Sequence, residues 1–216
     1  MNLKLYIKSI ISFFEIRNKK HYSRNYSEDD IKKTYAIKEN YNKLKQELIN
    51  KNTLVSTQLI SPIEDTPFDS LKYKSILKSL GDPKYKVLTK LGDRKIVVSI
   101  FYTGKGRFKS KIISYSFKNE VFLLTYEFKN KTRKQIKEIT NVIRAKYLDV
   151  QELDLTNDFI IDENNVILSF DIDFDLSLSY HSNSEIYNYV DYLIDLEKLT
   201  KRDKKTKRYK EFYDKL

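Results

Sequence analysis

The sequence predicts an α+β fold: a mostly antiparallel sheet of about five to six strands, with helices packed on one face and with N- and C-terminal helical arms. Three observations predict it. Several segments alternate apolar and polar residues and are joined by short turns, as antiparallel strands are. Other segments place apolar residues three and four positions apart, as helices do. With 216 residues, the chain can also bury a core without disulfides or metal ions.

We expect three parts in the chain. Residues 1–66 form a helical arm and linker, residues 67–199 form the α+β core domain, and residues 200–216 form a basic C-terminal helix or tail. Ser27 is the expected N-cap of a helix in the first part, and residues 50–67 predict a linker because they contain Asn, Thr, Ser and two prolines. Nearer the start, an amphipathic helix is expected to dock on the domain, on a partner or on a lipid surface through Leu3, Tyr6, Ile7, Ile10 and Phe14.

The core domain is expected to begin with a short helix. This helix ends at Gly81, because glycine adopts the left-handed conformation easily and Pro83 prevents continuation. Four strands are then predicted, at residues 86–91, 95–103, 107–117 and 120–128.

The second half of the core domain contains a helix, two strands and a last helix. Thr132 and Gln135 predict a capping box for the first of these helices. Strands are expected at residues 159–162 and 166–180. The final core helix is predicted to start near Ser182 and to carry its apolar residues at Ile186, Tyr189, Val190, Leu193 and Leu196.

Two resemblances to known families follow from these elements. Residues 76–85, ILKSLGDPKY, and the aromatic-rich hairpins up to residue 128 resemble outer-membrane assembly lipoproteins of the SmpA type, in which a helix ends in Leu-Gly-x-Pro before a meander. The order of elements over residues 68–199 is similar to the α-βββ-α-ββ-α order of type III secretion chaperones. The second resemblance implies dimerisation and the holding of extended partner segments.

Charge is distributed unevenly along the chain, whose formal net charge is +11. Residues 149–197 carry thirteen acidic and no basic residues, whereas residues 198–216 carry nine basic and three acidic ones. If the acidic and basic parts share one sheet, cross-strand pairs stabilise it and the surface potential partly cancels. If they form separate surfaces, the molecule favours head-to-tail association or a charged partner.

A row of aspartates is the first candidate site. Asp171, Asp173 and Asp175 alternate with apolar residues, so one strand would carry all three on one face, about 6.5–7 Å apart. Such a row requires solvent, lysines on the next strand, or a divalent cation. It predicts a wet or lysine-paired face, with a metal site and general acid–base use as alternatives.

Basic segments are the second candidate site, for nucleic acid or another anion. They comprise a predicted strand, the start of the following helix and the tail: Arg107, Lys109, Lys111, Arg133, Lys134, Lys137, Lys204, Lys205, Lys207 and Arg208. Next to the tail cations, Tyr209, Phe212 and Tyr213 have the i, i+3, i+4 spacing of a packed or partner-contacting helix. Aromatic stacking on single-stranded nucleic acid is the alternative for these residues. A solvated tail and contact with a charged protein or lipid surface are the other interpretations of the basic segments.

The residue types argue against an enzyme. The chain has no cysteine, four glycines that form no phosphate-binding loop, and two histidines, His21 and His181, without a metal-binding spacing. We therefore expect a non-enzymatic, cytoplasmic protein-interaction domain without cofactor, and without signal peptide or transmembrane segment. Its expected partner is another protein or a second copy, with nucleic acid as the alternative and a divalent metal as the third hypothesis.

Overall fold

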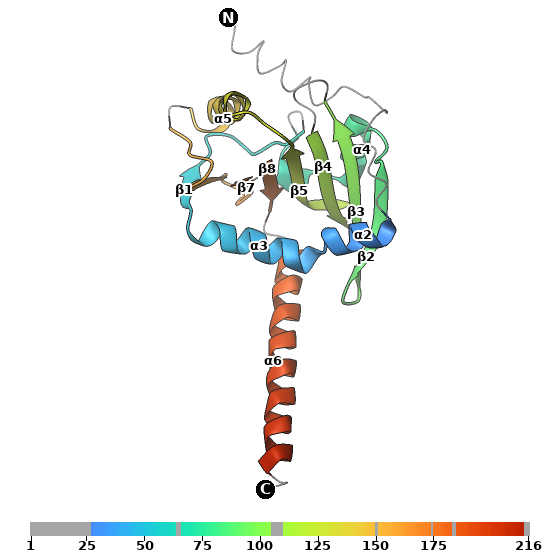
Figure 1. Ribbon diagram of the computed structural model, residues 1–216. Helices are drawn as coiled ribbons and strands as arrows, with labels where there is room; N and C mark the ends of the chain where they lie inside the picture. The colour runs from blue at the N-terminus through green and yellow to red at the C-terminus, as the bar shows by residue number, and fades with distance from the viewer. Residues whose placement is uncertain are drawn as a thin grey trace, which may run out of the picture.

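The computed structural model describes residues 27–63, 66–104, 110–149, 151–173, 175–182 and 185–213, with side chains as far as residue 200. It is an α+β fold built on one mixed sheet of eight strands (Figure 1). In chain order the elements are α2 (Glu28–Thr34), α3 (Ile37–Ile49), β1 (Asn52–Val55), the 3-10 helix η1 (Phe68–Ser70), α4 (Tyr73–Leu80), β2 (Tyr85–Leu91), β3 (Arg94–Thr103), β4 (Ser110–Phe117), β5 (Glu120–Phe128), α5 (Arg133–Tyr147), β6 (Asp158–Ile161), β7 (Ile167–Ile172), β8 (Leu176–His181) and α6 (Glu185–Tyr213). The amphipathic helix expected from Leu3 to Phe14 lies outside the described residues.

The strands follow the spatial order β1-β6-β7-β8-β5-β4-β3-β2. Each neighbouring pair is antiparallel except β1 and β6, which are parallel. The antiparallel character of the sheet is confirmed, but the expected number of strands was too low. Two additional strands account for the difference.

Strand β1 lies in the segment that was expected to be a linker. It pairs along its whole length with β6, and hydrogen bonds at both ends complete the ladder: the Asn52 amide donates to the Asn157 carbonyl at 2.6 Å and the Ser56 amide to the Ile161 carbonyl at 2.7 Å. The strand has only four residues and is largely exposed. Because it is so short, it shows no alternating pattern in the sequence, and the linker prediction was wrong for these residues.

The long strand expected at residues 166–180 is a hairpin. β7 ends at Ile172 and β8 begins at Leu176, with Asp171 opposite Ser177 and Ile172 opposite Leu176. Three residues separate Ile172 from Leu176, so these two facing residues are four positions apart and their side chains lie on the same side of the sheet. The alternation of apolar and polar residues in the sequence therefore continues unbroken through the turn.

Helices cover both faces of the sheet, not one face as expected. On one face, α4 and α5 pack on a core that includes Ile112 and Leu124. On the other, α2, α3 and the first turns of α6 pack on a second core that includes Ile113 and Phe122. Central strands such as β4 are buried on both sides. They therefore require two covering layers.

Several helix boundaries are confirmed. Ser27 forms a capping box at the start of α2, Thr132 and Gln135 form one at the start of α5, and α4 ends at Gly81, whose φ is +77°. The helix after Ser27 is interrupted at Tyr35, however, so that α2 and α3 are separate.

Helix α6 is one continuous helix of 29 residues, where a core helix followed by a separate basic helix or tail was expected. At 1.5 Å per residue it is roughly 43 Å long. Figure 1 shows it leaving the sheet beneath α3 and projecting away from the rest of the molecule. Among the described residues, no helix is long and apolar enough to span a membrane.

Candidate functional site

The three aspartates do not form a row on one strand, because the segment that carries them folds as a hairpin. Asp171 is the penultimate residue of β7, whereas Asp173 and Asp175 lie in the turn to β8. Asp175 accepts a hydrogen bond from the Asn130 amide at 2.9 Å, and Asp173 is exposed. Within the described part of the chain, no group of three or more His, Asp or Glu side chains could hold a metal ion.

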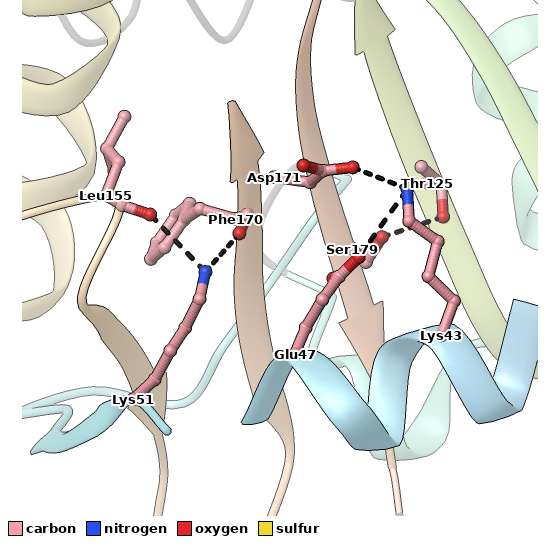
Figure 2. A network of polar contacts seen from close by, with 8 residues as sticks. All are labelled: Lys43, Glu47, Lys51, Thr125, Leu155, Phe170, Asp171 and Ser179. Atoms are coloured by element: carbon pink, nitrogen blue, oxygen red, sulfur yellow. Dashed lines mark hydrogen bonds and ion pairs between the residues drawn. The ribbon is translucent and has the colours of Figure 1, made fainter. Parts of the chain in front are cut away.

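Asp171 belongs to a polar network between α3 and the sheet (Figure 2). Lys43 on α3 donates to Asp171 at 2.7 Å and lies 3.5 Å from Glu47. The bond to Asp171 raises the pKa of Lys43. Burial, followed by the charge of Asp171, raises the pKa of Glu47. The cation that pairs with Asp171 is therefore Lys43, which lies on a helix packed against the sheet and not on the next strand.

Lys51 extends this network at the end of α3. Its ammonium group donates to the carbonyl oxygens of Phe170 on β7 and, at 3.5 Å, Leu155 (Figure 2). Burial lowers the pKa of Lys51. Lys43 therefore fastens α3, and Lys51 the bend that follows it, to β7 through polar contacts.

The sheet face beneath α3 carries polar side chains in cross-strand rows. One row runs across four strands, from Lys111 through Glu127 and Ser177 to Asp171. In the next row, the hydroxyl groups of Thr125 and Ser179 are hydrogen-bonded at 3.0 Å (Figure 2). The charged groups of these rows are bonded to one another or to α3, so the arrangement accounts for the docking of that helix.

Lys111 is not available to an external anion. Its side chain is buried, and it is bonded to Glu127 and, at 2.5 Å, to the Tyr35 hydroxyl. Burial alone would lower the pKa of Lys111, but the charge of Glu127 and the hydrogen bonds to Glu127 and Tyr35 raise it overall. Arg107 and Lys109, predicted to share its strand face, lie outside the described residues.

The other predicted basic residues lie in different places. Arg133, Lys134 and Lys137 are exposed in the first turns of α5, on the opposite face of the sheet from Lys111. The remaining cations and the aromatic residues lie in the last turns of α6, at the far end of the molecule in Figure 1, where only the backbone is described: Lys204, Lys205, Lys207, Arg208, Tyr209, Phe212 and Tyr213. The fold therefore does not bring the predicted basic segments together.

His181 lies in β8, where it is almost fully buried and packs edge-on against Tyr187 at 6.1 Å. Burial lowers its pKa to about 3, so the imidazole is neutral at physiological pH. The Nε2 atom has no hydrogen-bond partner. His21, the other histidine, lies outside the described residues.

The base of α6 is held firmly against the domain. Ile186, Tyr187 and Val190 are buried. The Tyr187 ring stacks on Tyr41 of α3 at 4.6 Å, and the Tyr41 hydroxyl donates to Asp191 at 2.9 Å. This packing fixes the direction in which the helix leaves the domain.

Ion pairs surround the same base. They join α6 to α3 and to the start of β3: Lys38–Glu197, Lys45–Asp191 and Arg94–Glu185. Three acidic residues of the cation-free segment 149–197 are thus paired with cations from other parts of the chain. The pairs are solvent-exposed, so each contributes about 0–1 kcal/mol to stability.

The opposite side of α6 carries exposed apolar side chains. Tyr192, Leu196 and Leu199 have 59%, 46% and 56% of their surface exposed. They are four and three residues apart, which places them on one side of the helix, opposite Val190. We call these three residues the α6 stripe. Sequence reasoning placed Leu196 in the core and did not single out Tyr192 or Leu199, although their i, i+4, i+7 spacing could have revealed a second apolar side.

Comparison with known proteins gives no relative. No family model, curated protein or solved structure matches this chain. The resemblances to SmpA-type proteins and to type III secretion chaperones stay predictions.

Proposed function

We propose that this chain is a non-enzymatic protein-interaction domain that presents α6 to a protein partner. The α6 stripe is the observation that supports this most. Fully burying a large apolar side chain is worth about 1.5–3 kcal/mol, and each of the three residues still has about half of that surface to bury. Their arrangement along a projecting helix is the pattern by which one helix docks into a groove or against another helix.

The geometry of α6 gives a second reason. From Asp195 to Thr200 every residue is exposed, so this part of the helix has little contact with the domain. Helices without tertiary packing are only marginally stable in water. A partner that covers the stripe would stabilise this part, while the packed base around Tyr187 holds the helix in a defined direction.

Photo-crosslinking in the cells that produce the protein tests this proposal. A photoreactive phenylalanine analogue replaces Tyr192, Leu196 or Leu199 in turn, with Leu88 as the control. Leu88 is 50% exposed but lies on β2 and is not part of the α6 stripe. We expect one discrete adduct from the stripe positions and none from Leu88. No adduct from any stripe position would contradict the proposal, as would equal labelling from Leu88.

Nucleic-acid binding is the second candidate, and the placement of the α5 cations favours it. Arg133, Lys134 and Lys137 occupy the first turns of a helix that has no acidic residue in its first turn. Cations there oppose the helix dipole, so an anion would relieve the repulsion. Changing these three residues to glutamine should weaken binding to single-stranded nucleic acid at low salt. No retardation of such a strand by the unchanged protein would remove this candidate.

A further inference from the structure

We infer that the partner of α6 is a second copy of this chain and that the two helices pair antiparallel through the α6 stripe. This inference rests on the proposed function. It adds the identity of the partner and the direction of pairing, both of which follow from the charges along the helix.

The two halves of α6 carry opposite charge. The first half contains Glu185, Asp191, Asp195 and Glu197 and no cation. Residues 198–213 contain eight basic and two acidic residues. A parallel pair would set the basic halves side by side, where like charges repel. An antiparallel pair sets each basic half beside the acidic half of the other copy.

The acidic half remains accessible although it forms pairs within its own chain. Its four carboxylates are bonded to Lys38, Lys45, Arg94 and Lys198. Each of the four acidic side chains nevertheless keeps at least 40% of its surface exposed. A carboxylate has two oxygens and about four acceptor sites, so it can accept a second cation without losing the first.

The stripe fits the same arrangement. Leu196 is its middle residue, so two helices that cross there in opposite directions bring Tyr192 of each copy near Leu199 of the other. The same crossing sets Lys207 level with Glu185 of the second copy, and both positions lie on the side of the helix that carries the stripe. Apolar contact at the centre and opposite charges on either side therefore occur together in one geometry. Because the stripe is small, we expect a dimer that dissociates on dilution.

Mass measurement in solution tests the pairing. Light scattering across a concentration series of the full chain should rise from 25.8 kDa toward twice that value. The double variant Leu196→Glu/Leu199→Glu should remain at the monomer mass with its cooperative unfolding retained, because both side chains are exposed. Leu88→Glu, the matched control, should dimerise as the unchanged chain does. A chain that stays monomeric, or a dimer that the double variant leaves intact, would overturn the inference.

A spin label tests the direction of pairing. The chain has no cysteine, so Lys207→Cys provides a unique attachment point. In the antiparallel dimer that crosses at Leu196, the two labelled positions lie roughly 33 Å apart along the helix axes. In a parallel dimer they lie about 10 Å apart. The short distance would overturn the antiparallel geometry.

The two proposals can fail separately. A photo-crosslinked adduct with a different protein, together with a monomeric purified chain, would overturn self-pairing and leave the interaction function in place. Absence of any adduct at the stripe would remove both.

Discussion

Lys111 should behave as a structural residue, because its charge is buried and paired with Glu127. Replacing it with methionine keeps the volume of the side chain but leaves the Glu127 carboxylate without its cation. Breaking a fully buried pair in this way costs about 3–5 kcal/mol. The Glu127 side chain is 23% exposed, so water compensates in part and we expect a loss of about 2 kcal/mol in the free energy of unfolding.

A double-mutant cycle in urea tests this reasoning. Glu127→Gln alone should also destabilise the protein, because it leaves the buried ammonium group of Lys111 without its counter-charge. The double variant Lys111→Met/Glu127→Gln should be more stable than the sum of the two single changes predicts, by about 1 kcal/mol or more. Additive effects, or a loss below about 0.5 kcal/mol for Lys111→Met, would show that the pair does not form as described.

Two further predictions concern His181 and the glycines. The folded-state pKa of His181, about 3, lies below the ordinary value of 6.5, so the unfolded chain binds its proton more readily and stability falls as pH drops below 6.5. By pH 5 the free energy of unfolding should have fallen by about 2 kcal/mol because of this group. In the His181→Leu variant, urea midpoints measured between pH 7 and 5 should lack this fall. An unchanged pH dependence in that variant would contradict burial of the histidine. Gly92→Ala should destabilise the protein more than Gly81→Ala. Both residues have a positive φ, and we expect the backbone strain of alanine to cost about 1–3 kcal/mol at either site, but only at Gly92 would the added Cβ also overlap with a side chain, at the Tyr189 hydroxyl. The thermal midpoint should therefore fall further for Gly92→Ala, and equal falls would refute the close approach of Tyr189 to Gly92.

Local signals in the sequence predicted local structure well. Ser27, Thr132 and Gly81 specify helix ends through contacts within a few residues, so their outcome does not depend on the rest of the fold. Strands β2 to β5 were predicted from the same kind of local alternation. The turn inside residues 166–180 was missed because alternation continues through it, although fifteen residues are many more than the usual strand length of about 5–6.

Features that depend on distant partners could not be predicted. β1 becomes a strand because it pairs with the edge of β6, and the four residues of β1 carry no alternating pattern that would predict this pairing. The cation that pairs with Asp171 comes from α3, far away in the sequence. For the same reason the sequence could not show that Lys111 is buried, or that Tyr192 and Leu199 project beyond the domain. Each of these facts follows from how elements are stacked, which periodicity alone does not encode.

Hydrogen exchange of the α6 amides, followed as the concentration of the full chain is raised, tests the central claim most directly. If a second copy covers the α6 stripe, the amides from Asp195 onward should exchange more slowly at high concentration and remain fast in the Leu196→Glu/Leu199→Glu variant. The amides around Tyr187 should be protected in both proteins because the base of the helix is packed. Fast exchange beyond Asp195 in the unchanged chain at every concentration would contradict pairing through α6.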